Sequence, residues 1–212
     1  MIETNDLSKQ YNNDFWAVDG VTLNVQPGQI LALLGQNGAG KTTTVRMLTA
    51  LLAPTRGWAR VAGYDVTKNP QEIRSAVGVL TEQHGLYMRM TGIEYLDFFG
   101  KVYGLSPSAR KMRSEYLLEY FGLAEAGKRR SGEYSKGMKQ KLALARALLH
   151  DPSVLLLDEP TSAMNQNHPA LSVMRSHACV HLSGRSFFVR IISPKQKHWQ
   201  IISLSFIAGK SC

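Results

Sequence analysis

One short motif constrains this chain more than any other feature: a glycine-rich loop between an apolar run and a helix-compatible segment. Residues 35–42 read Gly-Gln-Asn-Gly-Ala-Gly-Lys-Thr, which fits the pattern G-x-x-x-x-G-K-[ST]. The apolar residues 30–34 predict a buried parallel strand before it, and the spacing of residues 43–52 predicts a helix after it. A plain strand-to-helix turn with an exposed lysine is the alternative, and both flanking segments argue against it.

Such a loop has a defined chemical use. Glycines let the backbone turn so tightly that successive N–H groups point at one anion, and the following helix presents its positive end to the same place. We expect Lys41 to reach the β- and γ-phosphates of a nucleotide and the Thr42 hydroxyl to ligate Mg²⁺. The nucleotide contacts predicted in this stretch are Gly35, Gln36, Asn37, Gly38, Ala39, Gly40, Lys41, Thr42 and Thr43.

A second site is predicted where the apolar run of residues 154–157 ends in two acids. Ligands of open parallel sheets sit at the carboxyl ends of the strands, so this run would deliver Asp158 and Glu159 beside the phosphate loop. Asp158 can hold Mg²⁺, and Glu159 can polarise the water that attacks the γ-phosphate. Two surface acids at a strand end are the alternative, which the upstream phosphate loop makes the weaker interpretation.

Charge and composition narrow the class of protein. The net charge is +9, but residues 163–212 hold six of the 25 Lys and Arg residues and none of the 16 acids. These basic residues are scattered rather than clustered, which argues against a nucleic-acid patch. Neither a signal peptide nor a membrane span is predicted, and the two cysteines, Cys179 and Cys212, suggest no disulfide framework or zinc site.

The rest of the chain reads as an α/β domain. Two strands are expected in residues 1–26, and short strands over 58–62 and 77–80. Helices are expected over 91–104, 107–121 and 138–149, with a loop over 131–137 before the last. Tyr11 and Trp16 precede the phosphate loop, where an aromatic side chain can stack on a base or simply cover a sheet edge.

These landmarks together resemble the ATP-binding subunit of ABC transporters over residues 1–165. Residues 35–42 match its Walker A motif, residues 134–140 (Tyr-Ser-Lys-Gly-Met-Lys-Gln) its signature loop, and residues 154–159 its Walker B motif. Tyr11 falls where the family keeps an aromatic residue that stacks on adenine. Residues 85–105 look like the exporter branch, which includes sodium and drug efflux systems.

The resemblance implies a fold and a mechanism. The fold is an α/β P-loop NTPase with a mainly parallel sheet, an N-terminal antiparallel β part and a helical subdomain over about residues 83–150. The cofactors are ATP and Mg²⁺. Two subunits pack head to tail, so that Ser135 and the Gly137 amide of one reach the γ-phosphate bound to the other, although an ordinary helix cap would also explain this stretch.

The same resemblance implies partners and a location. A transmembrane permease subunit docks on the helical subdomain, and no nucleic-acid partner is expected. The location would be cytoplasmic, peripheral on the inner face of the cell membrane. Closure on ATP, with Glu159 as base and Lys41 on the phosphates, would drive export through the permease. Two alternatives remain: a non-catalytic ATP-binding remnant, and a soluble ABC protein acting on ribosomes or DNA.

Three departures from the family pattern stand out. Glu82 occupies the position of a glutamine that senses Mg²⁺ and water, and Asn165 that of an aspartate in the dimer contact. Beyond residue 165 the resemblance ends, and no switch histidine follows a strand. Back-translation of residues 190–212 in a shifted frame gives His-Asn-Leu-Ala-Glu-Ala-Glu-Ala-Leu-Ala-Asp-His-Ile-Ala-Ile-Ile-Tyr-Arg-Gly-Lys-Ile-Val, which looks like the missing segment.

We therefore hypothesise that residues 166–212 are an out-of-frame tail that does not fold natively. A divergent natural tail is the alternative. With an out-of-frame tail, the sheet is expected to lose a central or adjoining strand, which would expose unpaired edges.

Overall fold

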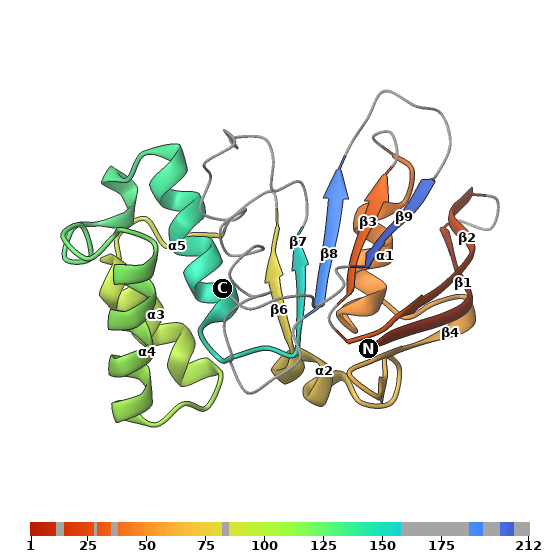
Figure 1. Cartoon of the computed structure of the whole chain (residues 1–212), viewed down its shortest axis with the longest axis horizontal. Coiled ribbons are helices and arrows are strands. Elements are labelled where there is room, and N and C mark those ends of the chain that lie inside the picture. Colours follow the sequence, from red (N-terminus) through yellow and green to blue (C-terminus); the bar gives the residue numbers. More distant parts are fainter. Residues whose placement is uncertain are drawn as a thin grey trace.

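A computed structural model describes residues 1–11, 15–27, 29–34, 38–81, 85–157, 187–192 and 200–205. Within these residues, α-helices alternate with strands along much of the chain (Figure 1). The helices are α1 Lys41–Leu48, α2 Pro70–Ala76, α3 Gly92–Val102, α4 Pro107–Tyr120 and α5 Lys136–Leu148, with a 3₁₀ turn at Ser131–Glu133. The strands are β1 Ile2–Tyr11, β2 Phe15–Val25, β3 Gln29–Leu34, β4 Arg56–Val61, β5 Tyr64–Asp65, β6 Val77–Leu80, β7 Val154–Leu157, β8 Phe187–Ile192 and β9 Gln200–Ser205.

The strands form two sheets. The first is antiparallel, in the order β2-β1-β4-β5, and the second has the order β6-β7-β8-β3-β9. In the second sheet all pairs are parallel except β3 with β9. Figure 1 shows α3, α4 and α5 gathered beyond the β6 edge, away from the antiparallel sheet. The expected combination of a mainly parallel sheet, an antiparallel β part and a helical subdomain is confirmed.

Two hydrophobic cores share the strands β6 and β7. On β7, Leu155 and Leu157 pack into the core beneath α3, α4 and α5, whereas Val154 and Leu156 pack into the core around α1 and the antiparallel sheet. Successive side chains of a strand point to opposite faces, so a short apolar run serves both cores. All four β7 residues are buried, as expected for a strand covered on both faces.

Local sequence explains where the helices of the subdomain begin. Thr91 caps α3, because its hydroxyl accepts from the Glu94 amide at 3.2 Å while the Glu94 carboxylate accepts from the Thr91 amide at 2.9 Å. Ser106 caps α4 and Pro107 follows at the first helical position. The half-buried Arg110 then joins the two helices, donating to Asp97 at 2.7 Å and to the Leu105 carbonyl at 3.0 Å.

Most expected elements lie where the sequence places them, with ends shifted by a few residues. The helix α1 begins at Lys41 rather than at residue 43, and α5 begins at Lys136 rather than at residue 138. The helix α2 and the two-residue strand β5 were not predicted. In α2 the signal was Pro70 directly after Asn69, which together mark a helix start.

The tail differs from expectation. Instead of a sheet that lacks a strand, β8 lies between β7 and β3, and β9 pairs with the other edge of β3. Residues 187–192 read Phe-Phe-Val-Arg-Ile-Ile, an apolar and β-branched run that suits a central parallel strand whichever reading frame encodes it. Asn165 and the other residues of 158–186 lie outside the described residues, as do residues 193–199 and 206–212.

Candidate functional site

The phosphate loop is described from Gly38 onward, and it leads directly into α1. Gly38 and Gly40 both have positive φ, at 86° and 82°, and Gly40 is the N-cap residue of the helix. Lys41 is buried, with 6% of its surface exposed, whereas Thr42 is exposed and Thr43 half-buried. The first turn of α1 contains no acidic residue, and its N-cap makes no side-chain hydrogen bond. The described part of the loop therefore combines a lysine with a helix N-terminus, a combination that suits an anion.

A close approach fixes the position of this loop against β2. A Cβ added to Gly40 would lie 2.0 Å from the Ala17 carbonyl oxygen and 2.9 Å from a methyl of Val18. The next residue back, Trp16, pairs with Gln10, and Phe15 pairs with Tyr11. The aromatic end of the β1–β2 hairpin therefore lies beside the phosphate loop. Tyr11 is 36% exposed there, with the Lys9 ammonium 5.7 Å from its ring centroid.

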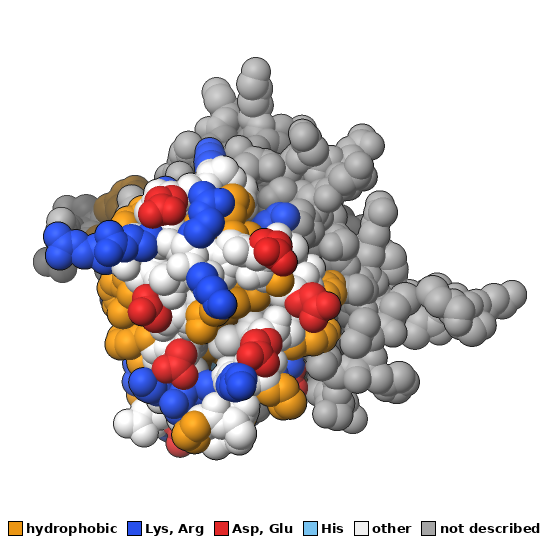
Figure 2. Space-filling model, turned by 90° about the vertical axis from the view of Figure 1, so that its left-hand side faces the viewer, with side chains coloured by type: hydrophobic (Ala, Val, Ile, Leu, Met, Phe, Trp, Pro, Cys, Tyr) orange, Lys and Arg blue, Asp and Glu red, His pale blue; other side chains and the backbone are white. Residues whose placement is uncertain are grey.

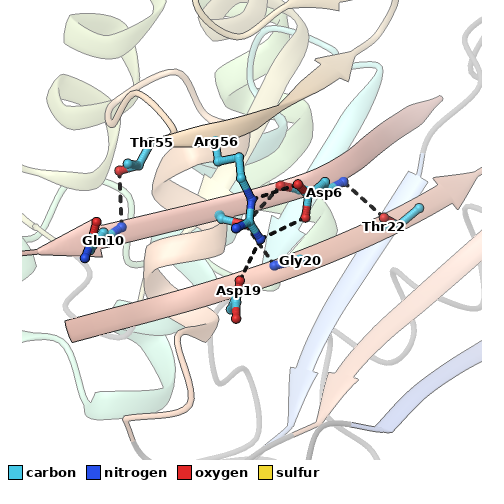
Figure 3. Close-up of polar contacts among 8 residues, drawn as sticks. Asp6, Gln10, Asp19, Gly20, Thr22, Thr55 and Arg56 are labelled. Atoms are coloured by element: carbon cyan, nitrogen blue, oxygen red, sulfur yellow. Dashed lines mark hydrogen bonds and ion pairs between the residues drawn. The ribbon is translucent and has the colours of Figure 1, made fainter. Parts of the chain in front are cut away.

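One arginine ties this hairpin to β4. Arg56 pairs with Asp6 at 2.7 Å and with Asp19 at 2.8 Å, and its guanidinium lies 5.2 Å from the Trp16 ring centroid. Figure 3 shows the arginine reaching from β4 across Asp6 toward Asp19, with the Gln10 amide donating to Thr55 on the same side. Gly57, at φ +74°, lies so close that an added Cβ would be 2.2 Å from the Asp6 carbonyl oxygen. Three strands are thus clamped near Tyr11.

The predicted signature loop lies at the N-terminus of α5. Ser135 is exposed and caps the helix, its hydroxyl accepting from the Met138 amide at 3.3 Å. Gly137 lies in the first turn, where an added Cβ would meet no described atom within 4 Å. Figure 1 places α5 on the other side of β6 and β7 from α1, so Ser135 and the phosphate loop belong to opposite parts of the subunit. An anion-binding role for Ser135 within one subunit is therefore not supported.

The residues before Ser135 are anchored to the segment 87–90. The Ser131 amide donates to the Met90 carbonyl at 2.8 Å, the Gly132 amide to that of Met88 at 3.0 Å, and the Ser131 hydroxyl to that of Tyr87 at 2.9 Å. Tyr134 is buried and donates to the Ala126 carbonyl at 2.6 Å, and burial raises the pKa of its hydroxyl. The start of α5 is therefore held firmly against the end of the loop that follows β6.

The remaining predicted site residues lie outside the described residues: Gly35, Gln36, Asn37, Glu82, Asp158 and Glu159. The strands that lead to them are described. Leu80 of β6 pairs with Leu157 of β7, so the loops that carry Glu82 and Asp158 leave the sheet from adjacent positions of one edge. The last residues of the two strands before these loops are therefore neighbours in the sheet.

Sequence reasoning missed two polar residues inside the helical subdomain. Arg146 of α5 donates to the Tyr95 hydroxyl at 3.0 Å and to the Val79 carbonyl at 3.4 Å. His150 stacks on Tyr103 with 3.9 Å between ring centroids, and burial lowers the pKa of His150 to about 4. Both residues fall in or just after an apolar helical pattern, in which a single polar residue gives no signal of its own.

Comparison with known proteins agrees with this geometry. The family model described as "ABC transporter" matches residues 18–162. The ATP-binding protein NatA of Bacillus subtilis is 44% identical over 78% of this chain and 69% of its own length. The bacitracin transport ATP-binding protein BcrA of Bacillus licheniformis is 42% identical over 78% of this chain, but only 53% of its own length is covered. The chain therefore spans about half to two thirds of these relatives.

Solved structures show the same fold. A dimeric post-hydrolysis structure of the ATP-binding cassette MJ0796, bound to ADP and Pi, has a TM-score of 0.77 at 22% identity and covers 91% of this chain and 94% of that one. An ATP-binding subunit of an ABC transporter has a TM-score of 0.77 at 31% identity, with 91% and 80% covered. Among the described residues, no helix is long and apolar enough to cross a membrane. The match over residues 18–162 and the shared fold establish that this chain belongs to the ABC transporter family, as one of its ATP-binding domains.

Proposed function

We propose that this chain is the ATP-binding and ATP-hydrolysing subunit of an ABC exporter that drives transport through a membrane permease. The observation that carries the proposal is the phosphate loop at the start of α1, pressed against the aromatic end of the β1–β2 hairpin. Relatives named for bacitracin transport and doxorubicin resistance support the exporter assignment, although the chain spans only part of their length.

The phosphate loop suits a nucleoside triphosphate. An added Cβ at Gly40 would strike the Ala17 carbonyl, so only glycine allows the backbone to curve here with positive φ. We assign the loop amides and Lys41 to the phosphates, and Gly35, Gln36, Asn37, Gly38, Ala39, Gly40, Thr42 and Thr43 to the loop that surrounds them. Tyr11, exposed at the neighbouring hairpin, is assigned to the adenine ring.

Mg²⁺ would be held by the Thr42 hydroxyl and Asp158. The exposed Thr42 at the first turn of α1 fits this role. Bound there, the ion would neutralise charge on the phosphates. We assign Glu159 as the base that takes a proton from the attacking water, and Glu82, leaving the same sheet edge, as a neighbour of that water.

The second ATP-binding subunit would complete the site. The helix α5, which has Ser135 as its N-cap and Gly137 in its first turn, lies on the other side of β6 and β7 from α1 (Figure 1), so we assign these two residues to a γ-phosphate bound to another copy. The dimeric MJ0796 cassette is a precedent for such pairing in the family. We propose a head-to-tail dimer in which the N-terminus of α5 faces the phosphates held by the partner subunit.

The permease would dock on an exposed aromatic surface. Tyr87 is 48% exposed, Met88 51% and Phe98 36%, and they lie together where α3 meets the segment 87–90. Large exposed aromatic side chains are typical of protein interfaces. A subunit that docks there would be peripheral on the inner, cytoplasmic face of the cell membrane.

Rival functions make different predictions. A soluble ABC protein acting on ribosomes or DNA would need a basic face, but the end of the molecule formed by α3 and α4 intersperses acidic and basic side chains (Figure 2). Co-purification with RNA rather than with a membrane subunit would favour that rival. A non-catalytic remnant would bind ATP without releasing phosphate.

The test is to measure ATP binding and phosphate release on the full chain. Lys41→Ala should remove binding, and Glu159→Gln should keep binding while slowing release by about 10²–10⁴-fold. Binding without release, unchanged by Glu159→Gln, would show the remnant instead. Absence of ATP binding in the unaltered chain would contradict both.

We further propose that the ATP-binding domain comprises residues 1–165, with its helical subdomain over about 83–150, and that residues 166–212 are encoded out of frame, even though β8 and β9 of this tail pair with β3. The support is the back-translation of residues 190–212, which yields a switch histidine and an acidic helix. Sequencing the coding DNA from the Ser162 codon past the stop tests it. A frame that matches the chain as printed would refute the frameshift and make the tail genuine.

A further inference from the structure

Arg146 is the point at which three parts of the helical subdomain meet. It lies on α5, the helix that begins at Ser135. Its guanidinium donates to Tyr95 of α3 at 3.0 Å and to the Val79 carbonyl of β6 at 3.4 Å, and it lies 5.3 Å from the Phe99 ring centroid. The planar side chain of Arg146, which extends from α5, therefore contacts both the strand β6 and the helix α3.

The strand contact lies next to the loop that follows β6. β6 ends at Leu80, and the loop that carries Glu82 follows it. Where that loop becomes described again, an added Cβ at Gly85 would lie 3.7 Å from the Arg146 guanidinium. Arg146 thus contacts the chain just before and just after the loop proposed to sit beside the attacking water.

The contact with α3 begins a series of aromatic rings that ends at the surface. Tyr95 is fully buried, and its ring lies 4.9 Å from that of Phe99. Phe99 stacks on Tyr87 at 6.1 Å and meets Phe98 edge-on at 5.2 Å. The rings form one cluster from the buried Tyr95 to the exposed Tyr87 and Phe98. A shift of the guanidinium would therefore move a connected set of rings, because closely packed side chains cannot move independently.

We propose that Arg146 is a positioning residue that couples ATP occupancy to the aromatic surface of Tyr87 and Phe98. The inference rests on the proposed function, since it needs ATP to act on the loop after β6. Burial raises the pKa of Tyr95 while Arg146 opposes the rise, so the tyrosine stays neutral and accepts the bond. Lysine cannot reproduce the arrangement, because it lacks the planar group that bonds Tyr95 and Val79 while lying against Phe99.

The experiment compares three variants of the full chain. Arg146→Lys keeps the positive charge but not the planar guanidinium, and Tyr95→Phe removes a single hydroxyl. Arg113→Met is the matched control, because Arg113 donates to two backbone carbonyls, those of Leu148 at 2.7 Å and Leu149 at 3.2 Å, and takes part in none of the cation–π contacts found among the described residues. Each is tested for ATP affinity and for amide hydrogen exchange in α3, with and without ATP.

In the unaltered chain we expect ATP to slow exchange in α3 by about fivefold or more. Arg146→Lys should bind ATP within about threefold of normal affinity and lose this effect, Tyr95→Phe should weaken it, and Arg113→Met should retain it. ATP-dependent protection that survives in Arg146→Lys would overturn the inference, as would ATP binding that leaves α3 unchanged in the unaltered chain. If the unaltered chain binds no ATP, the proposed function fails and the inference falls with it.

Discussion

The two cores on either side of β6 and β7 are built by different means. Around α1, aliphatic side chains from two sheets interlock, and the strands are joined at the surface by ion pairs such as that of Arg56 with Asp6. The core of the helical subdomain is also mainly aliphatic, but it adds aromatic rings and polar bonds, as at Tyr134 and Arg146. The helical side therefore depends in part on directional contacts that a small shift can change, whereas the sheet side rests on nondirectional apolar packing.

The largest effect should come from the contact that fixes the phosphate loop. Gly40→Ala should lower ATP affinity by about 100-fold or more, because the added methyl meets the Ala17 carbonyl and the residue must hold a positive φ. Gly63→Ala is the control: its φ is also positive, at 89°, but nothing lies within 4 Å of the added Cβ. Isothermal titration with ATP measures both. Equal losses in the two variants would mean that a methyl group at any positive-φ glycine lowers the affinity, whether or not it meets β2.

The shared strand offers the sharpest comparison. Leu155→Ala and Leu156→Ala should each lower the free energy of unfolding by about 2–5 kcal/mol, since both side chains are fully buried. Hydrogen exchange should separate them, with α5 loosening in Leu155→Ala and α1 in Leu156→Ala, because the two leucines face different cores. Leu51→Ala, with a side chain 68% exposed, is the control and should have little effect. Identical exchange patterns would mean that the cores do not respond separately.

Acid should weaken the helical side first. Burial lowers the pKa of His150 to about 4; the Val77 backbone opposes this shift, the charge of Arg113 adds to it, and the charge of Asp151 opposes it. In the unfolded chain His150 binds a proton near pH 6.5. Its contribution to the free energy of unfolding is therefore constant above that pH and falls as the pH drops toward 4. The loss should reach at most about 3 kcal/mol. Denaturant unfolding against pH measures it, and a slope that persists in His150→Phe would assign the loss to other groups.

The smallest effect is expected at the surface of the antiparallel sheet. Arg56→Gln removes ion pairs to Asp6 and Asp19 that are half exposed, so the melting temperature should fall by no more than about 2 °C. Arg110→Gln should cost more, because the side chain of Arg110 is only 15% exposed and bonds both Asp97 and Leu105. A larger fall in melting temperature for Arg56→Gln than for Arg110→Gln would show that the ion pairs of Arg56 matter more for stability than their exposure suggests.

Much of this fold could be predicted from local patterns. The strand over 77–80 and the strand over 154–157 were placed to the residue, because continuous apolar runs between turn signals leave little choice. Ser106-Pro107 likewise marked the start of α4. The phosphate loop and the signature loop were predicted for the same reason, since each is a contiguous motif, and the roles of their residues stay predictions.

What could not be predicted depends on contacts between distant residues. The approach of Gly40 to Ala17 and the three contacts of Arg146 join segments whose proximity no local pattern reveals. The place of residues 187–192 in the sheet was not predicted either, although this apolar, β-branched run suits a central strand. The roles assigned to Asp158, Glu159 and Glu82 stay predictions.

The position of β3 in the sheet has a consequence for biosynthesis. The residues that pair with Leu31 are Val189 and Ser203, which leave the ribosome long after the phosphate loop has been made. Until then both edges of the strand next to the phosphate loop lack their partners, which is a state prone to aggregation. A lesion in the last quarter of the gene would therefore first lower the yield of soluble protein, even though every residue of the phosphate loop had been translated correctly.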